Sequence, residues 1–187
     1  MDEKGLLAIG LGDWCAPAKS SPLILTDSIE AYDISNLGNE HITAGMIVCE
    51  NGKFKKSDYR TFRIGSVEGT DDYASMREAM ERRLEHLTDG EGSFARLPDL
   101  ILLDGGRGHV GGVRELMAER GLDIPVFGMV KDDFHKTRAL CTEDEEISIA
   151  REQSVFQLVY KIQEEVHRFT VKAMSGAKSK ALTHSSL

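Results

Sequence analysis

Residues 100–132 constrain the fold most, because two apolar runs flank a segment with a helical pattern. Residues 100–103 (LILL) are wholly apolar and lie between a proline and a glycine, which is typical of a strand buried on both faces. The helical segment VGGVRELMAERG then ends at Gly121, a suitable C-cap, and residues 124–132 form a second buried strand. Two such strands joined through a helix by short links predict a right-handed parallel crossover.

Three strands are predicted before this unit, at residues 29–35, 42–50 and 55–64. Asn51 and Gly52 separate the last two, and an Asn-Gly pair between apolar runs is a strong hairpin signal. The domain is therefore expected to open with an antiparallel meander of three strands.

The remaining segments complete an α/β pattern. Apolar side chains at helical spacing predict helices at residues 71–87 and 152–174, and residues 134–149 predict a short hairpin insertion. This order predicts a mixed sheet, three antiparallel strands and then parallel β/α units, with helices on its faces. The expected organisation is a linker or disordered lead-in at 1–28, the domain at 29–174 and a flexible tail at 175–187.

Composition narrows the class of protein. The chain has 187 residues and a net charge of −8, from 23 Lys and Arg against 31 Asp and Glu. This argues against a protein that binds nucleic acid through an overall positive charge. No run approaches the length of a membrane span, and the acidic start is unlike a secretory signal, so we expect a cytoplasmic location and no membrane contact. Three cysteines without a CxxC pair argue against disulfides and a Cys-based zinc site.

Two aspartates stand out because of where they lie on predicted strands. Asp33 is in the middle of the first strand, where carboxylates are rare, and Asp104 ends the strand at 100–103. If these strands are neighbours, the carboxylates converge and need a cation such as Mg²⁺ or Mn²⁺, which would bind a phosphate oxygen and activate water. Alternatively, Asp104 is a turn or helix cap, and Asp33 pairs with an arginine.

His167 lies on the flank of the last predicted helix, one step off its apolar stripe. Its functional interpretation is a third metal ligand or a general base, and its ordinary interpretation is a boundary residue of the helix. The other histidines form no HxxxH pair, so the sequence does not support a zinc site.

The segment GRGHVG offers a rival function, because Gly106, Gly108 and Gly111 match the G-x-G-x-x-G of dinucleotide-binding turns. The segment follows a strand, opens a helix, and has Asp132 at the end of the next strand. Against this function, the unit comes fourth in the sheet, and Asp104 would face the pyrophosphate. A flexible helix entry is the simpler alternative.

Basic residues cluster in KFKKSDYR, in the pair at 82–83, in KDDFHKTR and in the last helix with its tail. Such clusters usually form a solvated surface. If several lie around the acidic centre, they would provide phosphate contacts.

Together these stretches resemble the C-terminal nuclease half of UvrC, a component of the bacterial excinuclease ABC that acts in nucleotide excision repair. The resemblance covers roughly residues 29–170. It implies a ribonuclease H-like fold and a metal-dependent phosphodiester cut on the 5′ side of a DNA lesion. It rests on six consecutive stretches: IEAYDISN, ENGKFKKSDYRTFRI, DDYASMREAMERRLEHL, LPDLILLDGGRGH, GLDIPVFGMVKDD and VHRF.

The resemblance also implies site residues. The family's catalytic triad falls on Asp33, Asp104 and His167, which would hold Mg²⁺ or Mn²⁺, and a further acidic position falls on Asp72. Asp72 and its neighbour Asp71 could equally cap their helix. Lys131 is a candidate for approaching the scissile phosphate.

The partners that the resemblance implies are damaged double-stranded DNA and, in the full-length protein, the excinuclease component UvrB. The segment that binds UvrB, the GIY-YIG nuclease and the helix-hairpin-helix pair are absent here, so a weak enzyme is expected. Arg107 and His109 replace the usual Lys and Gln, and TVKAMSGAKSK replaces the usual basic segment after VHRF. A non-catalytic module that binds a repair partner is a further alternative.

Overall fold

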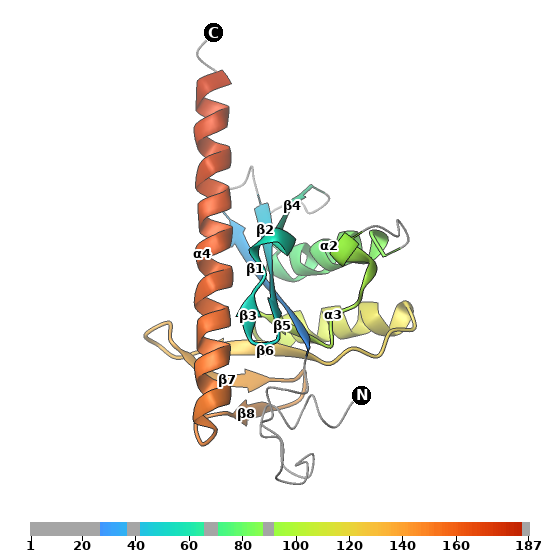
Figure 1. The fold of residues 1–187 in the computed structure, drawn as a ribbon, viewed down its shortest axis with the longest axis vertical. Helices are drawn as coiled ribbons and strands as arrows, with labels where there is room; N and C mark the ends of the chain where they lie inside the picture. Colours follow the sequence, from blue (N-terminus) through green and yellow to red (C-terminus); the bar gives the residue numbers. More distant parts are fainter. Residues whose placement is uncertain (1–26, 37–41, 66–70, 88–91, 185–187) are drawn as a thin grey trace.

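The computed structural model describes residues 27–36, 42–65, 71–87 and 92–184, which form a mixed sheet with helices on both faces (Figure 1). The eight strands run in the order β3-β2-β1-β5-β6-β7-β8, and β4 also pairs with β2. Their bounds are β1 Ser28–Asn36, β2 Ile42–Glu50, β3 Lys53–Phe54, β4 Arg60–Ile64, β5 Leu100–Leu103, β6 Val126–Lys131, β7 Thr137–Cys141 and β8 Glu146–Ser148.

The pairing of the central strands confirms the predicted topology. β1 is antiparallel to β2 and parallel to β5, and β5 is parallel to β6 through the predicted crossover. All four residues of β5 are buried, as its apolar run indicated. The carboxyl ends of β1 and β5 therefore lie side by side in the middle of the sheet.

The predicted hairpin forms, but the third strand is broken. Asn51 and Gly52 have positive φ values of 51° and 74°, as a two-residue hairpin turn requires. The expected strand at 55–64 is wrong in its first half, where a 3₁₀ turn, Lys56–Asp58, separates β3 from β4. Both β3 and β4 still pair with β2, and Lys55 Nζ contacts the carboxylates of Glu50 at 3.2 Å and Asp58 at 3.1 Å.

Three long helices cover the sheet. α2 (Asp72–Glu85) and α3 (Arg107–Glu119) lie on one face, and α4 (Gln153–His184) lies on the other (Figure 1). Each face has its own hydrophobic core: Ile29, Ala31 and Ile47 face α4, whereas Tyr32 and Met46 face α2 and α3. None of the described helices is long and apolar enough to cross a membrane.

The end of the chain differs from expectation in two places. The hairpin predicted at residues 134–149 is confirmed as β7 and β8, but it is not an insertion, because β7 pairs antiparallel with β6 and extends the sheet. α4 continues past Met174, where the helix was expected to end, as far as His184. The added residues include a single glycine and no proline, so nothing in this segment forces the helix to stop. The expected lead-in lies outside the described residues, except for 27 and 28.

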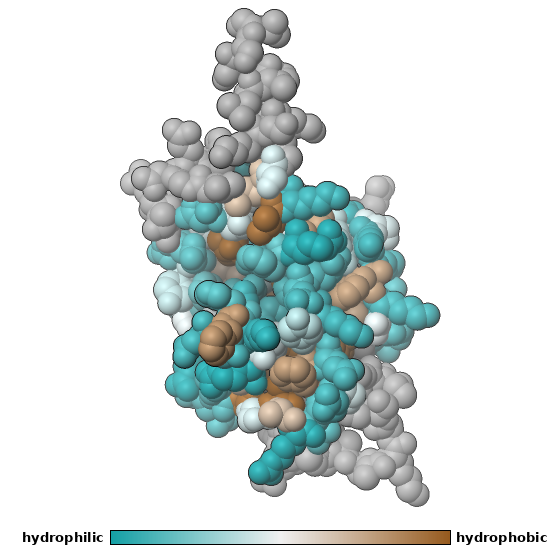
Figure 2. Space-filling model, turned by 90° about the vertical axis from the view of Figure 1, so that its left-hand side faces the viewer, coloured by the Kyte–Doolittle hydropathy of each residue, from teal (hydrophilic) through white to brown (hydrophobic). Residues whose placement is uncertain are grey.

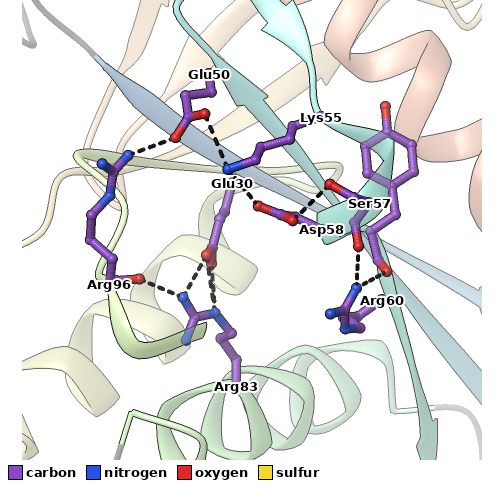
Figure 3. Close-up of polar contacts among 9 residues, drawn as sticks. Glu30, Glu50, Lys55, Ser57, Asp58, Arg60, Arg83 and Arg96 are labelled. Atoms are coloured by element: carbon purple, nitrogen blue, oxygen red, sulfur yellow. Dashed lines mark hydrogen bonds and ion pairs between the residues drawn. The ribbon is translucent and has the colours of Figure 1, made fainter. Parts of the chain in front are cut away.

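A buried ion pair joins α2 to β1 (Figure 3). Glu30 and Arg83 are 5% and 1% exposed, and Arg83 Nη2 lies 2.7 Å from Glu30 Oε1. Arg83 also donates hydrogen bonds to the carbonyls of Phe94 (2.9 Å) and Arg96 (2.8 Å), and the Tyr32 hydroxyl donates to Glu30 (2.5 Å). The buried charges are thus paired and hydrogen-bonded, as burial demands.

Candidate metal centre

The strand ends and α4 bring three predicted site residues together. Asp33 lies near the end of β1, Asp104 directly follows β5, and His167 lies on α4. The Asp104 amide donates a hydrogen bond of 2.7 Å to the Tyr32 carbonyl, which holds the two aspartates at the same level of the sheet. One ligand atom from each of Asp33, Asp104 and His167 lies within 4.8 Å of the other two.

The cluster is buried on the sheet side and open on the helix side. Asp33 is 4% exposed, Asp104 is half-buried, and His167 is exposed. His167 Nδ1 lies 3.2 Å from Asp33 Oδ2. A small ligand can therefore reach the three side chains from solvent.

A glycine on β2 allows α4 to approach Asp33. Gly45 is the partner of Asp33 in the β1–β2 register, and it packs against Thr170 of α4. A Cβ atom at position 45 would lie 3.0 Å from Thr170 Cβ and 3.2 Å from its Cα. His167 is three residues before Thr170, so the close contact at Gly45 positions the imidazole over the strand ends. Sequence reasoning missed Gly45, although a glycine inside a strand pattern is a signal of close backbone approach.

The position of Asp33 disfavours its negative charge. Burial, followed by the nearby charge of Asp104, raises the pKa of Asp33 from 3.8 to about 6. His167 and Lys131 act in the opposite direction but do not cancel this effect. A bound cation would offset the repulsion, and two carboxylates with one imidazole are a suitable donor set for a divalent ion.

Two neighbours hold the Asp104 carboxylate. Lys131 Nζ lies 2.7 Å from Oδ2, and Gln163 Nε2 donates to Oδ1 at 2.9 Å. Gln163 also donates to the Met129 carbonyl at 3.1 Å, and its own oxygen accepts the Thr137 hydroxyl hydrogen. Sequence reasoning did not assign a role to Gln163, but a polar side chain one turn before His167 was a usable signal.

Asp72 is not part of this three-residue cluster. It is the exposed first residue of α2, and the adjacent Asp71 is the N-cap, whose Oδ1 accepts from the amides of Tyr73 and Ala74 at 3.0 Å. Asp72 lies near His109: burial lowers the pKa of His109, and the charge of Asp72 counteracts part of that effect. A functional role for Asp72 stays a prediction.

Two glycines of GRGHVG have structural roles at the start of α3. Gly106 is the N-cap of α3, and a Cβ atom at Gly108 would lie 2.5 Å from the ring of Tyr73. Asp132, the expected ribose ligand, instead accepts hydrogen bonds from the amides of Phe134 and Lys136, both at 2.9 Å. These contacts explain the motif without a dinucleotide.

Comparisons with known proteins identify the family of this chain. The family model described as the UvrC RNase H endonuclease domain matches residues 23–171. UvrABC system protein C from Clostridium beijerinckii is 43% identical over 171 residues, which cover 85% of this chain and 28% of that protein. The same protein from Lachnospira eligens is 47% identical over 165 residues, covering 84% of this chain and 27% of the relative. This chain therefore spans little more than a quarter of the length of these relatives.

A solved structure shares the fold at low sequence identity. The crystal structure of human ENDOV aligns with a TM-score of 0.52 and 11% identity, covering 83% of this chain and 86% of that one. This similarity concerns the arrangement of strands and helices.

Proposed function

Because the chain belongs to the family of UvrC RNase H endonuclease domains, we propose that it hydrolyses a phosphodiester of DNA with a divalent cation held by Asp33, Asp104 and His167. The observation that carries the proposal is the convergence of these three side chains, from three separate elements, within 4.8 Å. Oxygen-rich donor sets favour Mg²⁺ or Mn²⁺, and we propose these as the cofactors.

The surrounding residues support this chemistry. A divalent cation at this site supplies an electrophile for a phosphate oxygen and lowers the pKa of bound water. Asp33 and Asp104 hold the cation, and Gln163 and Lys131 fix the Asp104 carboxylate. His167, exposed on α4, would either complete the ligand set or accept a proton from the attacking water. The Lys131 ammonium group is half-buried and placed to approach a phosphate oxygen.

We propose damaged double-stranded DNA as the substrate, cut on the 5′ side of a lesion during nucleotide excision repair. The excinuclease component UvrB is the proposed partner of the full-length protein, through a segment outside this chain. This chain covers 28% of the length of the Clostridium beijerinckii relative, so the activity of the whole protein is part of the proposal. The cytoplasmic location stays a prediction.

Calorimetric titration with Mn²⁺ and a plasmid-nicking assay test the proposal together. We expect the wild type to bind Mn²⁺ and to nick the plasmid, and Asp104→Asn to lose both. Asp27→Asn is the matched control, because Asp27 is exposed and lies just before β1, at the opposite end of that strand from Asp33. Binding without nicking in the wild type would favour a non-catalytic module, and equal heats in all three proteins would overturn the metal centre.

A further inference from the structure

We propose that the turn between β6 and β7 and the adjoining face of α4 bind the DNA strand next to the metal centre. In this proposal, which rests on the proposed nuclease function, Phe134 stacks on an unpaired base, and Lys136 and Lys172 contact phosphates. The surface would select DNA whose bases are unstacked near the cut.

A groove beside the metal centre is rich in basic side chains. Its volume is about 590 Å³, and it lies between the β6–β7 turn and α4. Glu164 is its one acidic lining residue, and the Tyr160 hydroxyl donates a 2.6 Å hydrogen bond to it. The basic lining residues are Lys131, His135, Lys136, His167, Arg168 and Lys172. This local charge contrasts with the net charge of −8 and suits a polyanion.

Two of these lysines are available to a ligand. Lys136 and Lys172 are exposed, and neither ammonium group has an ion pair or hydrogen bond with another described residue. Arg168 differs, because its guanidinium group binds Glu165 at 2.8 Å. The lysines are thus the cations of the groove that can bind phosphates without breaking an internal pair.

Phe134 is 82% exposed at the tip of the turn. The face of the molecule around α4 is mostly hydrophilic, with separate hydrophobic patches, and the turn projects beyond α4 (Figures 1 and 2). The turn is held rigidly: the Asp132 carboxylate accepts from two amides of the turn, and the Asp132 amide donates to the Lys136 carbonyl at 2.8 Å. His135 closes the turn with a φ of 59°. The backbone of such a turn loses little freedom when the ring stacks on a base.

The turn is connected to the metal centre at both of its ends. Lys131, which precedes it, binds Asp104, and Thr137, which follows it, donates a hydrogen bond to Gln163. Phe134 is three positions after Lys131, which is at most about 10 Å of chain. That length corresponds to about three nucleotides of a duplex strand. A base stacked on Phe134 would therefore belong to a nucleotide close to the scissile phosphate.

Stacking requires an accessible base face, which a paired duplex does not offer in its interior. Aromatic side chains beside a basic groove are the usual combination for binding single-stranded nucleic acid. The proposal thus predicts a preference for a duplex with an unpaired central segment over a fully paired duplex.

Fluorescence anisotropy with two DNA probes tests the proposal. One probe is a duplex with an unpaired central bubble, and the other is the fully paired duplex of the same length, both with Ca²⁺ in place of Mn²⁺. We expect Phe134→Ala to weaken binding of the bubble by roughly 5- to 150-fold and to leave the paired duplex unaffected. Phe134→Trp should retain binding, and Phe54→Ala, which alters a partly exposed phenylalanine on β3, is the control.

The lysines are tested by the salt dependence of binding. The slope of the logarithm of the binding constant against the logarithm of the salt concentration should become less steep by about 1.5 to 2 in the double variant Lys136→Gln/Lys172→Gln. We expect this for either probe, because two phosphate contacts are lost. Lys53→Gln on β3 should leave the slope unchanged.

The outcomes separate this inference from the proposed function. Equal bubble affinities of the wild type and Phe134→Ala, or no binding of either probe at low salt, would overturn the surface. Phe134-dependent binding without nicking in Mn²⁺ would retain the surface and count against the nuclease. If Phe134→Ala changes neither the nicking rate nor the affinity for DNA, the nuclease function is retained and the binding surface is rejected.

Discussion

The Asp33 carboxyl group destabilises the fold whenever it is ionised without a cation nearby. Its pKa is raised from 3.8 to about 6, first by burial and then by the charge of Asp104. A group whose pKa is higher in the folded state contributes stability that is complete below about pH 4 and lost as the pH rises through 6. A shift of about two units corresponds to about 3 kcal/mol.

Replacing Asp33 with asparagine should therefore stabilise the metal-free protein at neutral pH. We compare the free energies of unfolding of Asp33→Asn and the wild type in EDTA. The difference in favour of Asp33→Asn should be about 3 kcal/mol larger at pH 7 than at pH 4. Urea titrations at both pH values measure this difference. Asp27→Asn should follow the wild type, and parallel pH profiles for Asp33→Asn and the wild type would contradict the argument.

Lys131 competes with a cation for Asp104. Its ammonium group lies 2.7 Å from Oδ2 and is partly exposed, so the pair contributes about 1 kcal/mol. Lys131→Met should therefore bind Mn²⁺ about fivefold more tightly by calorimetry, although it should nick DNA more slowly. Lys161→Met, on an exposed position of α4, is the control. Unchanged or weaker Mn²⁺ binding in Lys131→Met would show that the lysine does not compete.

The packing of α4 on β2 depends on Gly45. A methyl group there would overlap Thr170, so Gly45→Ala should lower the free energy of unfolding by about 1 to 3 kcal/mol. It should also weaken Mn²⁺ binding, because moving α4 moves His167 away from Asp33. Urea titration and calorimetry measure the two effects.

A glycine on α3 provides the control for this substitution. Nothing lies within 4 Å of a Cβ atom at Gly112, so Gly112→Ala should stabilise the protein by about 0.5 to 1 kcal/mol and leave metal binding unchanged. Equal Mn²⁺ affinities of Gly45→Ala and the wild type would show that the close contact does not position His167.

The attachment of α2 to β1 depends on Arg83. Arg83→Met leaves Glu30 buried without its partner and should cost about 3 to 5 kcal/mol, measured by urea titration. Arg138→Met, which breaks the more exposed pair with Glu146 on β8, should cost less than about 1 kcal/mol. Adding Glu30→Gln to Arg83→Met should restore part of the loss. A similar cost for both arginines would contradict a special role of the buried pair.

The sequence predicted those features that depend on local pattern. The apolar run of β5, the Asn-Gly turn and the strand ends that carry Asp33 and Asp104 follow from periodicity and turn chemistry. It did not predict the break before β4, which depends on how the two segments pair with β2. The close approach at Gly45 likewise depends on how α4 crosses the sheet, which no local pattern specifies.

The described part of the molecule consists of two hydrophobic cores separated by one sheet, and the candidate ligands come from the sheet and from the helix on one of its faces. Asp33 and Asp104 belong to the strand ends, whereas His167 belongs to the helix that covers one face. A cation bound by all three would attach α4 to the strand ends. Metal binding should therefore be visible in the stability of the whole fold.

Mn²⁺ should raise the melting temperature of the protein as a single cooperative transition. A ligand that binds only the folded state stabilises it by about 2.7 kcal/mol at a hundred times its dissociation constant. For a chain of this size, that amounts to an increase of about 5 to 10 °C, measured by circular dichroism against a sample in EDTA. Asp27→Asn should show the full increase, and Asp104→Asn should show none. The same increase in Asp104→Asn would place the bound Mn²⁺ elsewhere, because the strand-end site has then lost one of its two carboxylates.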